Sequence, residues 1–471
     1  MANITYDESS HLLRRMGFGG SIDDISALAG RTRERAVDRL LDYESTDNQE
    51  MENRLRKGFN PKKFTPHEDL QLWWIVRMVL TARPFEEKMT LFWHNHFATA
   101  LDKVDYDLMY VQNQMLRSLA LDRFDTILLS VARDPAMLIW LDGVTSKNGA
   151  PNENFARESQ ELFSMGVTDV VTGTQNYTEA DVKGIARAFT GWQFTQKGDK
   201  RYQFRFQMVD REHDNGAKEI YGRTANFSGE DVIDLICARR ATGRFLVKKL
   251  FEFFVYPLSK TPEDLATIEK FADVYFSSNH SIKDLVRAIF ISDEFFSTRA
   301  RFALVKNPAE LVVGSFRMLG VDYNPGTVDG GDFETYFQFK RLGLDVMDPF
   351  DVSGWKLNLG WLNTATLLER YNFATRLLSD RNDDKRSPGP RLSNEQLKRY
   401  TDPSPEKTVR NFLSLLGPLN TDDATVRILS DYLQTNDAGG RVAWVVSDVS
   451  INKLVRGLVF LIMCLPEFQM N

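Results

Sequence analysis

Apolar residues recur at three- and four-residue intervals along most of the chain, a spacing that places them on one face of an α-helix. The pattern predicts helices over a long series of segments, among them 8–16, 21–43, 67–82, 84–101, 105–121, 152–166, 178–191, 241–256, 306–320, 362–380, 405–417 and 450–466. Several begin at a residue whose side-chain oxygen can accept a free backbone N–H, such as Thr178 and Ser228. The chain is therefore predicted to be mainly α.

One segment breaks the helical period. Residues 201–208 alternate large apolar with polar side chains, and they follow a second strand-like run that starts at Trp192. A turn-prone sequence, Lys197-Gly-Asp-Lys200, separates the two runs. This arrangement predicts one β-hairpin near 192–209, inserted between helices and expected to cover a site.

Composition and charge narrow the class of protein. Lys and Arg number 59 and Asp and Glu 65, for a net charge of −6, so no overall basic field attracts nucleic acid. No run reaches the roughly 18 apolar residues of a membrane span. The first residues lack the apolar segment of a signal peptide, so the cytoplasm is the expected location, with export alongside a partner left open.

Length alone allows two or three domains in 471 residues. Two stretches rich in charge or turn formers, 324–333 and 381–408, are predicted to be surface loops. A division into lobes 1–300 and 301–471 follows as an expectation.

The helix predicted from Pro84 carries two histidines. Phe85, Met89 and Phe92 mark its apolar face, and the same spacing brings His96 onto that face. His94 lies about 200° away around the helix, so it is expected to be half-exposed. On a regular helix these two imidazoles do not meet at one metal.

The segment 152–166 places a carboxylate on an apolar face. Glu158 shares the helical spacing of Phe155, and Glu161 follows one turn later. A buried carboxylate without a partner takes up a proton, and two neighbouring carboxylates shift each other's pKa or hold a metal. The structural alternatives pair Arg157 with Glu161 and place Glu158 in an ion pair with an arginine such as Arg187. The absence of an E-x-x-H pattern weakens the metal interpretation.

A third polar group follows the hairpin. His213, Asp214 and Lys218 lie in one turn-prone loop, which could bring a base, a carboxylate and a cation together. The alternative is a turn capped by its own side chains. Further side chains are expected to line a pocket near these groups: His94, Asn154, Trp192, Trp355, Trp361 and Asn363. The chain contains no G-x-S-x-G, Walker A, H-E-x-x-H or C-x-x-C motif.

These stretches together resemble one bacterial family, domain of unknown function 1800. The resemblance rests on residues 11–19, 88–97, 152–166, 177–183, 186–192, 213–218, 307–313 and 354–364. It implies a single family-length helical domain over 1–471 and supplies no mechanism. Members resemble companions of a second family, domain of unknown function 1501, which looks like the alkaline-phosphatase superfamily, so an accessory role beside such a partner is implied.

Two hypotheses follow. In the first, the chain is an enzyme with hydrolytic or metal-dependent chemistry, in which a divalent metal is an open option. Its site would consist of His96, Glu158, Glu161, Arg187, His213, Asp214 and Lys218. In the second, the chain is a non-catalytic binding or accessory protein, and the same side chains form a buried structural network.

Overall fold

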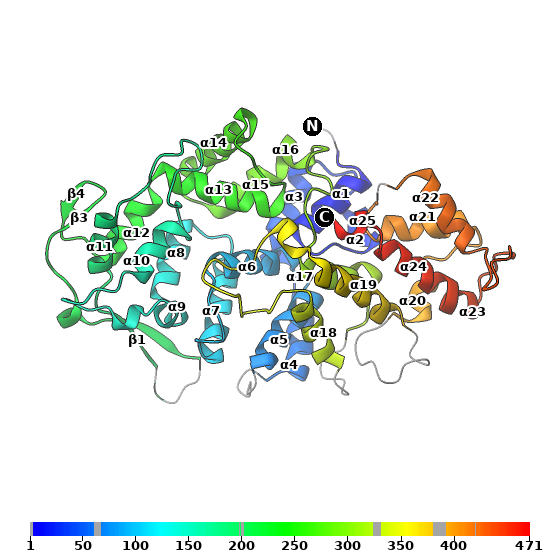
Figure 1. Cartoon of the computed structure of the whole chain (residues 1–471), viewed down its shortest axis with the longest axis horizontal. Helices are drawn as coiled ribbons and strands as arrows, with labels where there is room; N and C mark the ends of the chain where they lie inside the picture. Colours follow the sequence, from blue (N-terminus) through cyan, green and yellow to red (C-terminus); the bar gives the residue numbers. More distant parts are fainter. Residues whose placement is uncertain are drawn as a thin grey trace. The chain divides into compact units, whose positions relative to one another are not determined.

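A computed structural model describes residues 3–60, 67–196, 198, 202–323, 331–379, 392–419 and 421–471 of the chain. Helices dominate this part, and two short antiparallel strand pairs are the only sheets within it (Figure 1). The prediction of a mainly α fold is confirmed.

The chain forms two compact units. Unit 1 consists of Met1–Phe85, Phe296–Val346 and Lys356–Asn471, and unit 2 consists of Glu86–Phe295 and Met347–Trp355. Both units are thus assembled from segments far apart in sequence. The single domain, with lobes 1–300 and 301–471, stays a prediction.

Unit 1 is helical, and its helices begin at residues that cap them. The Thr5 side chain and Glu8 form a capping box at the start of α1, and Asn307 with Glu310 does the same for α17. The elements are α1 Tyr6–Met16, α2 Ile22–Leu28, α3 Arg33–Leu41, η1 Tyr43–Ser45, α4 Gln49–Gly58, α5 His67–Leu80, α17 Pro308–Leu319, α18 Gly331–Arg341, η5 Asn358–Trp361, α19 Thr364–Leu378, α20 Asn394–Lys398, α21 Pro405–Leu415, α22 Asp423–Tyr432, α23 Asp448–Ser450, η6 Ile451–Val455, α24 Arg456–Met463 and α25 Pro466–Gln469.

Unit 2 combines helices with all four strands. Within it α13, α14 and α15 pack in succession, and α10 packs on α11 (Figure 1). The elements are α6 Pro84–His96, which begins in unit 1, α7 Tyr106–Ser118, α8 Phe124–Arg133, α9 Pro135–Trp140, η3 Gly143–Thr145, α10 Asn154–Glu161, α11 Glu179–Ala188, β1 Trp192–Gln196, β2 Phe204–Met208, η4 Asp210–Glu212, β3 Lys218–Ile220, β4 Arg223–Ala225, α12 Gly229–Cys237, α13 Arg240–Phe254, α14 Pro262–Ser277, α15 Ile282–Ile291 and α16 Asp293–Phe296, which ends in unit 1.

Aromatic side chains around α6 form the core of unit 2. Trp93 is fully buried, stacks on Phe97 at 5.5 Å between ring centroids, and donates from Nε1 to the Ala120 carbonyl at 2.9 Å. Nearly every residue of α6 is buried, and His94 is 1% exposed. The expectation of a half-exposed His94 is wrong, because a helix buried all round has no solvent face.

The predicted hairpin is confirmed. β1 and β2 pair antiparallel, with Trp192 opposite Met208 and Gln196 opposite Phe204. Of the predicted turn 197–200, only Gly198 lies within the described residues. β1 packs against α9 and η3. A second, unpredicted pair, β3 with β4, follows in the chain.

Other elements are shorter than the periodicity predicts. The helix expected over 152–166 ends at Glu161, and Gly166 takes a left-handed φ of 74° beyond it. Of the surface loop predicted over 381–408, the described part, 392–408, holds α20 and the start of α21, and Leu392 and Leu397 in it are buried. Most of the predicted loop 324–333 lies outside the described residues. Within the described parts of the chain, no helix combines the length and hydrophobicity needed to cross a membrane.

Candidate functional site

Helix α10 presents two carboxyl groups in unlike surroundings. Glu158 is half-buried, and its Oε2 is sealed from solvent without a hydrogen-bond partner among the described residues. Burial, and next the charge of Glu161, raise the pKa of Glu158. Glu161 itself accepts a hydrogen bond at Oε2 from the Tyr177 hydroxyl at 2.9 Å. The two carboxyl groups therefore differ: Glu158 has a raised pKa, and Glu161 has a hydrogen-bond donor in Tyr177.

Neither predicted structural pairing of these carboxylates is present. Arg157 donates two hydrogen bonds of 2.8 Å to Glu179 and lies 3.6 Å from Glu153, so the expected Arg157 to Glu161 pair is wrong. Arg187 pairs with Asp214 rather than Glu158. Arg157 instead pairs with Glu179 of α11, and Arg187 pairs with Asp214 of the loop before β3.

His96 is buried, as predicted, but its partner is a backbone carbonyl. Its Nε2 donates to the Phe163 carbonyl at 2.8 Å, and its ring stacks on Phe92 at 5.8 Å between centroids. Burial, aided by the charge of Lys249, lowers the pKa of His96 to about 3, so the ring is neutral. No hydrogen bond or ion pair joins His96 to Glu158 in the described part of the chain. The link between them is indirect, since the Phe163 N–H donates to the Glu158 carbonyl at 3.0 Å.

His94 lies against the loop 347–355 of the same unit. Its ring centroid is 5.5 Å from that of Trp355, and burial lowers its pKa to about 3. The neighbouring Asn95 accepts the Trp355 N–H at 2.6 Å. Gly354, at a φ of 79°, lets the backbone approach Asn95 more closely than a Cβ would allow. His94 and Trp355 thus meet as expected, and Asn95 is a contact that sequence reasoning missed.

The loop after the hairpin forms a hydrogen-bonded ion pair. Arg187 donates to Asp214 from Nε at 2.6 Å and from Nη2 at 3.1 Å. These bonds lower the pKa of Asp214 to about 2. Asp214 also accepts the Gly216 N–H at 2.8 Å, which is the side-chain-capped turn that was the alternative interpretation.

Lys218 and His213 flank this ion pair. Lys218 is fully buried in β3 and donates to the Gly216 carbonyl and to Asn226, each at 3.0 Å. Burial lowers the pKa of Lys218. His213 donates from Nδ1 to the Thr190 carbonyl at 2.9 Å. The structure therefore brings Arg187, Asp214 and Lys218 together as predicted, but in a mutually satisfied arrangement.

The remaining predicted pocket residues are dispersed. Asn154 is exposed at the start of α10, where its N–H donates to Asn152 at 2.8 Å. Trp192 is buried in the hairpin against Phe189, at 4.9 Å between ring centroids. Trp361 and Asn363 belong to unit 1, where Asn363 caps α19. These residues fill structural roles that composition could not distinguish from ligand contacts.

No group of three or more His, Cys, Asp or Glu side chains within the described ranges could hold a metal ion.

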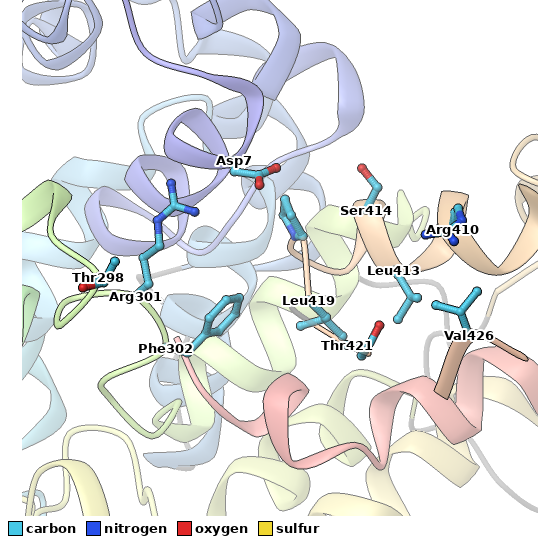
Figure 2. A pocket seen from close by; sticks show the side chains of 11 residues that line it. Asp7, Thr298, Arg301, Phe302, Arg410, Leu413, Ser414, Leu419, Thr421 and Val426 are labelled. Carbon is cyan, nitrogen blue, oxygen red and sulfur yellow. The ribbon is translucent and has the colours of Figure 1, made fainter. Parts of the chain in front are cut away.

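Unit 1 contains a cavity that the sequence did not predict. It has a volume of about 560 Å³ and is lined by residues from α1, the segment 298–302, α21 and α22, and by Pro418, Leu419 and Thr421. Figure 2 shows Thr298, Arg301 and Phe302 on one side of it and Arg410, Leu413 and Val426 on the other. A sequence signal did exist in Arg14 and Arg15, two adjacent arginines within the family-like segment 11–19, which the structure buries in this unit.

The comparisons with known proteins give the family. The family described as "Protein of unknown function (DUF1800)" matches residues 11–470, nearly the whole chain. The chain belongs to this family, as the sequence resemblance indicated. No curated protein and no solved structure matches the chain.

Proposed function

We propose that the protein is a hydrolytic enzyme in which Glu158 is the general acid and Glu161 the general base. The observation that carries this proposal is the buried Oε2 of Glu158, which has no hydrogen-bond partner among the described residues. Buried polar groups in folded proteins are nearly always satisfied, and a catalytic role is one explanation of an exception. A side chain that costs stability where it lies is a candidate for a group that acts on a ligand.

The unlike surroundings of the two carboxyl groups divide their roles. The pKa of Glu158 is raised, which is the direction that suits a general acid donating a proton to a leaving oxygen. Tyr177 donates its hydroxyl hydrogen to Glu161, and burial raises the pKa of that hydroxyl, so Tyr177 remains a donor. This hydrogen bond orients the Glu161 carboxyl group, as a base that activates water requires.

The other predicted residues have positioning roles in this proposal. His96 holds the Phe163 carbonyl just beyond the end of α10 and so fixes the path of the chain after Glu161. Arg187, Asp214 and Lys218 are satisfied by one another and by nearby backbone and amide groups. They support the strand pair β3–β4, which packs on α11 through β3.

The test uses amide variants that keep the shape of each side chain. Purified protein is assayed against p-nitrophenyl esters, phosphates and glycosides, and Glu158→Gln and Glu161→Gln are compared with the exposed control Glu219→Gln. We expect a cleaved substrate class, and a loss of kcat of about 10²–10⁴-fold in each site variant, the usual contribution of general acid–base catalysis. The control should retain full activity. Unchanged rates in both site variants would remove the proposal.

A pH profile adds a second criterion. Loss of the acid in Glu158→Gln should abolish the alkaline limb of the kcat/KM profile, whereas Glu161→Gln should abolish the acidic limb. A variant that is merely misfolded would lower the whole profile without changing its shape.

A second candidate function is an accessory role beside an alkaline-phosphatase-like protein. It is favoured by Phe350, which is 97% exposed in the loop 347–355 of unit 2. The loop is anchored, because Trp355 bonds to Asn95 and the Leu101 N–H donates to the Met347 carbonyl at 3.1 Å. An exposed aromatic side chain on a fixed loop is typical of an interface anchor.

The accessory function is tested by co-expression with such a phosphatase-like protein, followed by size-exclusion chromatography. A stable complex with the wild type that is lost in Phe350→Ser supports it. The matched control is Leu359→Ser, an exposed apolar residue of unit 1. Absence of a complex, or equal loss in both variants, contradicts it.

A further inference from the structure

The cavity of unit 1 combines an apolar wall with cationic side chains. Its apolar lining includes Phe302, Leu413, Leu419 and Val426, and its volume of about 560 Å³ is in the range of small-molecule sites. In Figure 2 Leu419 and Thr421 lie between the two sides. A cavity with this lining suits a ligand with an apolar body. The charged residues determine which polar head group of that ligand would be favoured.

The two arginines that line the cavity differ in their partners. Arg410 donates from Nε to Glu406 at 2.9 Å and lies 3.6 Å from Asp423, so its charge is matched. Arg301 forms no hydrogen bond or ion pair with any described residue. Its guanidinium is therefore available to a ligand, and Asp7 is the one carboxylate in the lining.

A third arginine lies just behind the lining. Arg14 is 4% exposed, and its guanidinium carbon lies 5.0 Å from the centroid of the Phe302 ring. It donates from Nη1 to Ser10 at 2.8 Å, while its buried Nε has no hydrogen-bond partner among the residues that the structure describes. Gly417, at a φ of 104°, lets the chain before Pro418 approach this guanidinium more closely than a side chain would permit. Arg14 is thus a buried donor with unused capacity at the cavity wall.

The charge around Arg14 is unbalanced. The positive charge of Arg301 disfavours the charged form of the Arg14 guanidinium, whereas the negative charge of Asp7 favours that form. Lys306, which interacts with Arg14, Glu310 and Arg370, is buried together with these residues and Arg15. This connected set of seven side chains holds five basic groups and two carboxylates: Arg14, Arg15, Arg301, Lys306 and Arg370, with Asp7 and Glu310.

Burying unmatched cations is costly, and a bound anion would offset that cost. We propose that the cavity of unit 1 binds an organic anion, with a carboxylate or phosphate head group on Arg301 and Arg14 and an apolar body against Leu413, Leu419 and Val426. The planar guanidinium groups supply paired donors of the geometry that carboxylate and phosphate oxygens accept. This site lies wholly in unit 1 and is independent of Glu158 and Glu161 in unit 2.

The proposal is tested by calorimetric titration of the full chain with four probes: octanoate, octyl phosphate, octanol and inorganic phosphate. We expect octanoate and octyl phosphate to bind, and the tighter of the two identifies the head group. Octanol and inorganic phosphate, which lack the charge or the apolar body, should bind at least tenfold more weakly. Equal binding of octanol would overturn the proposal by showing an apolar cavity alone, and equal binding of inorganic phosphate would overturn the role of the apolar wall.

Variants locate the site. Arg301→Gln should weaken binding of the preferred anion about tenfold, and Arg301→Lys should restore part of the loss because it keeps the charge. Arg301 has no hydrogen bond or ion pair to lose within the described ranges, so these variants are expected to fold as the wild type does. The control Arg35→Gln removes an exposed arginine of the same unit that does not line the cavity. Undiminished affinity in Arg301→Gln, or an equal loss in the control, would overturn the assignment.

Discussion

Replacement of Glu158 by Met is expected to stabilise the protein at neutral pH. Met has a similar length, favours helices, and leaves no polar atom buried without a partner. In the wild type Oε2 of Glu158 is buried and has no hydrogen-bond partner in the described part of the chain, a situation that costs about 1–3 kcal/mol. Glu158 is only half-buried and its Oε1 is not fully buried, so we expect the lower end of this energy range. The expected gain is about 1 kcal/mol in the free energy of unfolding.

The gain should depend on pH. The folded protein binds the Glu158 proton more tightly than the unfolded chain, whose ordinary value is 4.5. The contribution of this group to stability is therefore fully present below pH 4.5 and is lost as the pH rises through the raised pKa of the folded state. Relative to the wild type, Glu158→Met should become more stable as the pH rises from 4.5 to 8.

Urea unfolding curves at several pH values measure this difference, with Glu219→Met as the exposed control. A variant that is less stable than the wild type by 3 kcal/mol or more would refute the reasoning, because a loss of roughly that size is what breaking a buried ion pair produces. Such a loss would mean that Glu158 has an ion-pair partner, and the proposal that it is an unsatisfied general acid would lose its support.

Three further outcomes are expected. His96→Phe should remove part of the acid sensitivity of folding. Because the pKa of His96 in the folded protein is lowered to about 3, the wild type loses about 2 kcal/mol of stability as the pH falls from 6.5 to 5, and the variant should not lose this part. Urea titration of both proteins at these pH values compares how their free energies of unfolding change with pH. Glu87→Ala should destabilise by about 3–5 kcal/mol, because Glu87 is fully buried and Arg117 donates to it at 2.7 and 2.9 Å; a loss below 1 kcal/mol in thermal unfolding would contradict this. Asp214→Asn should cost on the order of 1 kcal/mol at pH 7 by weakening the bonds from Arg187, and the difference should vanish as the pH falls from about 4 to about 2, measured by circular dichroism.

The local pattern of apolar and polar residues was sufficient to predict where the helices and the hairpin lie. Apolar spacing located α6, α10, α11 and the strands β1 and β2, because helix and strand periods follow from backbone geometry alone. Lengths were less well predicted. Periodicity continues past Glu161, but the chain leaves the helix there, and the Met165 and Gly166 N–H groups both donate to the Gln160 carbonyl.

Burial and partner choice were decided by the tertiary structure. The helical period correctly placed His96 inward, yet it placed His94 outward, because a single helix cannot indicate that neighbours cover all of its faces. Arg187 forms its ion pair with Asp214 instead of Glu158, because a charged side chain pairs with the carboxylate that the fold places next to it.

The sequence by itself determined the class of fold, the family and the presence of a carboxyl group on an apolar helix face. Only the tertiary structure decided that Oε2 of this carboxyl group is buried without a hydrogen-bond partner among the described residues, and that Arg14 lies buried beside the cavity that Arg301 lines. The physical reason is that helix formation depends on residues three or four apart, whereas cavities and charge balance depend on residues that are hundreds apart in sequence and adjacent in space.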